Sequence, residues 1–214
     1  RIKEHGGSEI MSYEDVEQPQ AGATEVLIKV EAAGINYIDT YQRSGLYQIP
    51  LPATLGLEAS GTVAQIGSDV SRFQVGDRVA YTNVLGAYAD YAAVDQDKVV
   101  SIPDAVSFDE GAAAMLQGCT AHYLSQSTYP IKSGDSCLIH AAAGGVGLIL
   151  IQMAKNAGCR YLVFTTKHHD GFALHDSKVS EFDAGSVLNR DLVKEIVDAC
   201  HKEGLRVGFY HSVI

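Results

Sequence analysis

The sequence predicts an α/β protein in two parts: a β-rich, barrel-like N-terminal domain, and a partial parallel sheet of β-α-β-α-β order. Two observations carry this prediction. Residues 1–100 are short apolar segments separated by glycine turns, which is typical of strands. From residue 136 onward, short apolar strands alternate with longer helical segments. Such alternation favours parallel strands joined by right-handed crossovers.

The strands of the first part follow from local patterns. Residues 25–30 alternate polar and apolar side chains, residues 61–66 are rich in β-branched side chains, and a Gly76-Asp77 turn leads into a strand ending at Tyr81. Spacing of this kind predicts a compact barrel-like domain with few helices over residues 1–106.

A change to helical character follows. Ser107 and Glu110 have the spacing of a capping box and open an alanine-rich helix that we expect to continue to about Gln126. This helix and the first βα unit of a nucleotide-binding domain occupy residues 107–158, and further βα units occupy residues 159–214. The expected elements are strands at 136–140, 161–166 and 205–210 and helices at 146–157 and 190–202.

Composition limits the classes of function. A formal net charge of −10 argues against nucleic acids and anionic membranes as partners, because both require a basic surface. The four cysteines are scattered without a CxxC pair, which favours a reducing, cytoplasmic setting. No apolar stretch reaches the roughly 20 residues of a transmembrane helix, and no signal peptide is evident.

The segment from Ala141 to Gly147 is a glycine-rich loop between a predicted strand and a predicted helix. This is the position of a dinucleotide fingerprint in a Rossmann-like sheet. Without side chains at Gly144 and Gly147, the amides near Gly145 and Val146 can approach a diphosphate at the helix N-terminus. The alternative is a βα turn that needs glycine only for its backbone angles.

Cofactor choice is indicated at the end of the second strand. An NAD-selecting carboxylate is expected about 20 residues after the fingerprint. The chain has Thr165 and Lys167 there instead, and these suit the 2′-phosphate of NADP(H). The alternative is that Lys167 is only a solvated loop residue.

Several motifs together resemble the quinone oxidoreductases, a zinc-independent family of the medium-chain dehydrogenase/reductase superfamily. The resemblance covers residues 1–158 and rests on residues 34–47 (GINYIDTYQRSGLY), 56–61 (GLEASG), 76–79 (GDRV) and 140–147 (HAAAGGVG). It implies a GroES-like fold for the first domain, NADP(H) as cofactor, a small quinone as substrate and a homodimer. In zinc-dependent relatives two of these motifs hold the metal. Here the positions are Asn36 and Leu57, so no metal is expected.

The resemblance also implies a catalytic pocket at which a hydride passes from NADPH to a quinone. Its lining would be Asn36, Asp39, Tyr41 and Tyr47, with Gln117 and Thr120 as further candidates. The same side chains could instead hydrogen-bond a loop, and Asp39 in particular could be mainly structural.

Residues 159–214 resemble a fragment of an α-L-fucosidase barrel of glycoside hydrolase family 29, through residues 161–172, 189–193 and 204–212. In that family the paired histidines, here His168 and His169, contact sugar hydroxyls. They could equally be a polar surface loop, and adjacent residues of an extended chain make a poor chelating pair. The strand expected to carry the fucosidase nucleophile lies beyond Ile214, so hydrolysis is not expected.

The sequence therefore predicts a chimera joined near Gly158, with NADPH-dependent quinone reduction as its function. This activity is expected to be impaired, because the second half of the nucleotide domain does not follow. The alternatives are an inactive hybrid and a fucose-binding fragment without hydrolytic activity.

Overall fold

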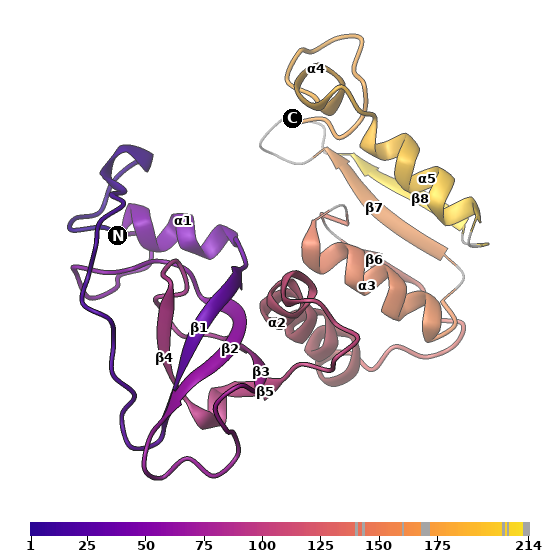
Figure 1. Ribbon diagram of the computed structural model, residues 1–214. Helices are drawn as coiled ribbons and strands as arrows, with labels where there is room; N and C mark the ends of the chain where they lie inside the picture. The colour runs from indigo at the N-terminus through magenta and orange to yellow at the C-terminus, as the bar shows by residue number, and fades with distance from the viewer. Residues whose placement is uncertain are drawn as a thin grey trace. The chain divides into compact units, whose positions relative to one another are not determined.

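The structure is a computed structural model of residues 1–214 and describes all of them except 140, 143, 160, 168–171, 203, 205 and 212–214. Residues 161–165, 167, 210 and 211 are described by their backbone. The chain divides into two compact units, Arg1–Leu116 and Gln117–Ile214 (Figure 1). The division lies inside a helix, later in the chain than the predicted boundary at residue 106.

The first unit contains an antiparallel sheet of order β4-β1-β2-β3-β5. Its strands are β1 (Glu25–Ala33), β2 (Glu58–Ile66), β3 (Arg78–Thr82), β4 (Tyr91–Asp95) and β5 (Val99–Ser101). The three predicted strands are confirmed, and each is longer than its apolar pattern. Their inward side chains, such as Val26, Val79 and Tyr81, are fully buried and form the core of this unit.

A helix that the sequence did not predict follows β1. Helix α1 (Tyr37–Ser44) begins after the N-cap Asn36 and ends at Gly45, whose φ of +82° closes the helix in the left-handed region. The short 3-10 helices Ser8–Ile10 and Gln96–Lys98 are also part of this unit.

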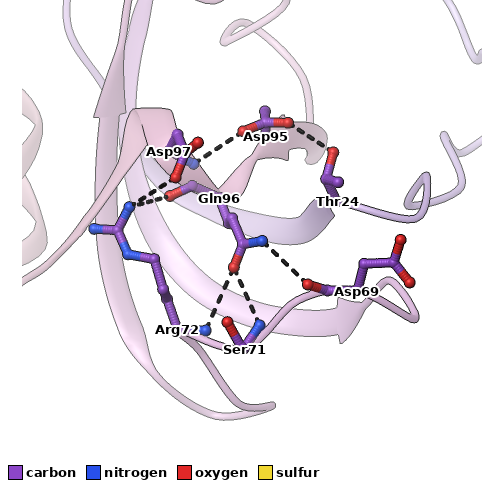
Figure 2. A network of polar contacts seen from close by, with 7 residues as sticks. All are labelled: Thr24, Asp69, Ser71, Arg72, Asp95, Gln96 and Asp97. Carbon is purple, nitrogen blue, oxygen red and sulfur yellow. Dashed lines mark hydrogen bonds and ion pairs between the residues drawn. The ribbon is translucent and has the colours of Figure 1, made fainter.

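A polar network fixes the loops at one end of this sheet (Figure 2). The Gln96 side chain accepts from the amides of Ser71 and Arg72, at 3.1 and 3.4 Å, and donates to the Asp69 carbonyl at 3.2 Å. Arg72 donates to the Gln96 carbonyl and to the Asp97 carboxylate, each at 3.2 Å. These bonds hold the loop after β2 against the connection between β4 and β5.

Helix α2 (Phe108–Tyr123) continues into a π-helical turn, Leu124–Thr128. Its start confirms the predicted capping box: the Glu110 carboxylate accepts from the Ser107 amide at 2.9 Å, and the Ser107 hydroxyl accepts from the Glu110 amide at 3.2 Å.

The second unit confirms the predicted β-α-β-α-β order. Parallel strands β6 (Cys137–Ile139), β7 (Tyr161–Lys167) and β8 (Arg206–His211) lie side by side in that order. Helices α3 (Gly145–Asn156) and α5 (Leu192–Lys202) pack against the sheet through Ile151, Ile196 and neighbouring apolar side chains (Figure 1). A short helix, α4 (Ala184–Leu188), lies in the segment expected to be a loop.

Candidate functional site

A buried acid lies behind Asn36 in the first unit. Glu58, the first residue of β2, is fully buried. One of its oxygens, Oε1, accepts from Asn36 Nδ2 at 2.7 Å, and the other, Oε2, accepts from the Leu116 amide at 2.6 Å. The carboxylate thus joins the N-cap of α1 to helix α2, so Asn36 is held on the side away from solvent.

The glycine at position 34 makes room for this acid. A Cβ built on Gly34 would lie 2.1 Å from Glu58 Oε1, far inside contact distance. The Gly34 amide also donates to the Glu58 carbonyl at 3.1 Å. The glycine in the motif GINY is therefore required by the carboxylate behind it rather than by a special backbone angle.

Asp39 has a structural position. Its Oδ2 accepts from the Asn36 amide at 2.8 Å and from the Tyr88 hydroxyl at 2.7 Å, and the residue is only 5% exposed. The geometry supports the interpretation that Asp39 shapes the loop, with its carboxylate oriented by α1 and Tyr88.

Burial raises the pKa values of Glu58 and Tyr88. It raises the pKa of Glu58 above its ordinary value, while the hydrogen bonds from Asn36 and Leu116 act in the opposite direction and the charge of Asp39 adds to the rise. Burial, followed by the bond to Asp39, also raises the pKa of Tyr88. Tyr88 therefore stays a neutral donor at physiological pH.

A cavity of about 410 Å³ opens over this cluster. Most of its wall surface is apolar, from side chains such as Ile35 and Leu55, and its polar lining residues are Asn36, Asp39, Thr40, Arg43 and Tyr88. An apolar cavity with a few fixed polar groups is suited to a small, flat organic ligand.

The two tyrosines of the predicted pocket lie apart from the lining of this cavity. Tyr41 and Tyr47 pack edge to face with ring centroids 5.5 Å apart, and the Tyr47 amide donates to the Tyr41 carbonyl at 3.1 Å. Both rings are exposed. Of the four predicted pocket residues, the structure brings Asn36 and Asp39 together in one cavity and places Tyr41 and Tyr47 as a separate pair.

Sequence reasoning gave no role to Glu58 or Tyr88. Glu58 bonds to a residue 58 positions away in the chain, and Tyr88 to one 49 positions away. One signal in the sequence points to Glu58: in GLEASG it is an acid at the start of a strand whose next side chains are small.

In the second unit, the glycines at the start of α3 differ in the atoms that surround them. The N-cap Gly144 donates to the Ala141 carbonyl at 2.8 Å, and its extended backbone carries no side chain that could cover the helix end. A Cβ on Gly147 would lie 2.5 Å from Ala141 O and from Ala142 Cα. Gly147 thus permits close packing of the helix on the loop, in addition to its predicted role of letting a diphosphate approach.

Gln117 contacts this loop. A Cβ on Gly145 would meet the Gln117 amide, whose Oε1 would be 1.8 Å away. Gln117 was expected at a pocket, and its side chain lies against the first residue of α3.

The residues expected to recognise the 2′-phosphate lie at the end of β7, the strand next to β6. Ile139, which ends β6, pairs with Phe164 of β7, so Thr165 and Lys167 extend β7 past the start of the loop. Their side chains lie outside the described part of the chain, as do His168, His169 and Asp170.

Comparisons with known proteins agree with this architecture. The alcohol dehydrogenase GroES-like domain family matches residues 22–104. A quinone oxidoreductase of Pseudomonas aeruginosa is 47% identical over 160 residues, which are 74% of this chain and 49% of that protein. Quinone oxidoreductase 1 of Escherichia coli is 40% identical over 214 residues, 98% of this chain and 64% of that protein.

A solved structure extends the likeness to both units. The Escherichia coli quinone oxidoreductase complexed with NADPH superimposes with a TM-score of 0.79 at 36% identity, covering 97% of this chain and 56% of that one. Over the aligned residues, the chain is similar in sequence and fold to quinone oxidoreductases. It has a GroES-like domain followed by a parallel βα sheet. It spans about half to two thirds of the length of these relatives.

Two further findings concern the last part of the chain and its helices. The α-L-fucosidase family matches residues 149–214. The end of the chain is therefore similar both to this family and to quinone oxidoreductase 1 of Escherichia coli. Within the described residues, no helix is both long and apolar enough to cross a membrane.

Proposed function

We propose that this chain performs, or contributes the acceptor-binding part of, NADPH-dependent quinone reduction without zinc. The observation that carries the proposal is the pairing of two sites on one chain: a glycine-capped helix after a parallel strand, and an apolar cavity with Asn36 fixed at its polar wall. The likeness to quinone oxidoreductases, one of them complexed with NADPH, supports it.

The first turn of α3 fits a diphosphate. The amides of Gly145, Val146 and Gly147 begin the helix and have no carbonyl four residues earlier within it. The N-cap Gly144 has no side chain to compete for them, and the positive helix end favours an anion. Ala141 completes the turn with a φ of +49°. Thr165 and Lys167 are proposed to hold the 2′-phosphate.

NADPH, when bound, supplies the hydride. The protein's own residues are proposed to orient the acceptor: Asn36 faces its oxygen, and Asp39 holds the Asn36 backbone through the 2.8 Å bond. An amide donor in an apolar cavity stabilises negative charge that develops on a quinone oxygen.

The test follows NADPH oxidation by the full chain with a fully substituted 1,4-benzoquinone, which has no ring C–H at which cysteine thiols could add. We expect Asn36→Ala to lower kcat/KM about tenfold or more. Gln48→Ala, which removes an exposed side chain bonded to the Gly45 carbonyl, is the control and should leave it unchanged. No saturable oxidation by the unaltered chain, or an unaffected Asn36 variant, would overturn the proposal.

The fucosidase likeness of residues 149–214 supports a second proposal: the chain is a composite, and its last quarter is a fucosidase-type segment that binds fucose without hydrolysing it. His168 and His169 are the proposed sugar contacts. Fucose should then shift NMR signals of these histidines, and alanine at both positions should abolish fucose binding measured by calorimetric titration. Histidine signals that do not respond to fucose would contradict this proposal.

A further inference from the structure

We propose that Glu58 is a positioning residue of the acceptor site, fixing which edge of the Asn36 amide meets the acceptor. The inference rests on the proposed quinone reduction and deepens it. An asparagine side chain offers a donating NH2 edge and an accepting carbonyl edge, and the two lead to opposite interactions with a quinone oxygen. The NH2 group has two N–H bonds, so fixing it through one of them orients the donating edge that is proposed above to meet the acceptor oxygen.

The geometry provides that hold. Asn36 Nδ2 donates to Glu58 Oε1 at 2.7 Å, so the NH2 group is fixed toward the buried carboxylate. Glu58 cannot easily turn away, because its Oε2 is bonded to the Leu116 amide at 2.6 Å and the residue is fully buried. A hydrogen bond between an amide and a carboxylate in such surroundings is stronger than one between neutral groups.

The neighbouring titratable groups are bonded to each other instead. Asp39 and Tyr88 share a hydrogen bond of 2.7 Å. The donors to Glu58 are the side-chain NH2 group of Asn36 and the backbone N–H of Leu116. Gly34 adds a steric condition, since any side chain there would overlap the carboxylate. Asn36, Glu58 and Gly34 thus act as one unit.

A double-mutant cycle tests the inference on the full chain. The dissociation constant and KM of the fully substituted quinone are measured for Glu58→Gln, Asn36→Ala and the double variant. Glutamine keeps the size but places an NH2 group against one of the two donors. We expect Glu58→Gln to weaken quinone binding about tenfold, with a larger effect on KM than on kcat. The double variant should be no worse than Asn36→Ala alone, because Glu58 acts through Asn36. Additive losses would overturn the inference.

A measurement on the unaltered chain covers the case in which Glu58→Gln does not fold. The Glu58 carboxyl carbon and the Asn36 side-chain NH2 are followed by NMR against pH. Both should titrate together, and quinone affinity should fall over the same range as pH decreases. An affinity that stays constant through that titration would overturn the inference.

A control variant and the binding of the unaltered chain distinguish a failure of this inference from a failure of the proposed function. Glu31→Gln removes an exposed carboxylate that pairs with Lys29 at 3.4 Å and should leave quinone binding unchanged. If the unaltered chain neither binds nor reduces the quinone, both the proposed function and this inference fail. If it binds the quinone and Glu58→Gln binds equally well, only the inference fails.

Discussion

The two units place their functional groups differently. The first unit holds Glu58 and Asp39 inside its packed interior, each bonded to specific donors. The second unit presents backbone amides at the carboxyl end of an open parallel sheet, where, among the described residues, the nearest atom to a Cβ built on Gly144 is Ala141 O at 3.2 Å. The first site is therefore specified by side-chain packing, and the second by backbone geometry.

Substitution of one glycine in each unit is the sharpest way to break this comparison. A Cβ on Gly61, between β1 and β2, would lie 2.0 Å from the Lys29 carbonyl oxygen, so Gly61→Ala must push the two strands apart. We expect a loss of about 3 kcal/mol in the free energy of unfolding. Gly144→Ala should cost less than about 1 kcal/mol. Denaturant unfolding measures both, and equal losses would contradict the comparison.

A smaller effect is expected on cofactor affinity. Gly147→Ala would force α3 away from Ala141 and should weaken NADPH binding about tenfold. The three atoms nearest to a Cβ on Gly145 all belong to the Gln117 side chain, so Gly145→Ala should weaken NADPH binding and a second change, Gln117→Ala, should restore it. Calorimetric titration of the variants decides this. A Gly147 variant with unchanged affinity would show that loop packing is not needed for the site.

The network of Figure 2 gives a weaker effect within the first unit. Gln96→Ala removes the bonds to the Ser71 and Arg72 amides and to the Asp69 carbonyl. These groups lie near water, so we expect a loss of about 1 kcal/mol in unfolding free energy. Gln48→Ala, with one exposed side-chain bond, is the control. A Gln96 variant as stable as the control would contradict this role.

The smallest effect is a difference in pH dependence between two carboxylates. The pKa of Glu58 is raised in the folded state, so its contribution to stability is complete below its ordinary value of 4.5 and is lost as pH rises through the folded pKa. The bonds from Ser107 lower the pKa of Glu110, so its contribution is present above 4.5 and is lost as pH falls through the folded pKa.

Unfolding free energies measured both below and above pH 4.5 therefore test the two signs. Relative to the unaltered chain, Glu58→Gln should become more stable as pH rises, whereas Glu110→Gln should become less stable as pH rises from below its folded pKa toward 4.5. Parallel curves for Glu58→Gln and the unaltered chain would contradict the raised pKa of Glu58.

Much of the fold could be predicted from the sequence, because its signals are local. Alternation of side chains found the strands, the Ser107–Glu110 spacing found the start of α2, and Gly158, with a φ of +91°, marks the end of α3 as expected. Helix α1 was missed because it has only eight residues, and its capping bond from the Asn36 amide to Asp39 resembles a polar loop in sequence.

The candidate site was predictable only in part. Asn36 and Asp39 were found through resemblance, and the structure places both at one cavity. Glu58 was missed because an acid beside an apolar strand looks the same whether it faces water or a distant amide such as that of Leu116. The cofactor role of Gly147 stays a prediction, and the structure adds a packing role, since a Cβ there would overlap Ala141 and Ala142. Contacts made by the tertiary fold decide such cases.

The most direct test of the central claim is an NMR titration of the full chain with NADPH, following the amides of Gly145, Val146 and Gly147 at the start of α3. The account predicts saturable shifts of these three signals, with little change at Gly61 in the sheet of the first unit. If the three amides do not respond at saturating NADPH, the α3 N-terminus does not bind the diphosphate, and the assignment of a nucleotide site to this chain is wrong.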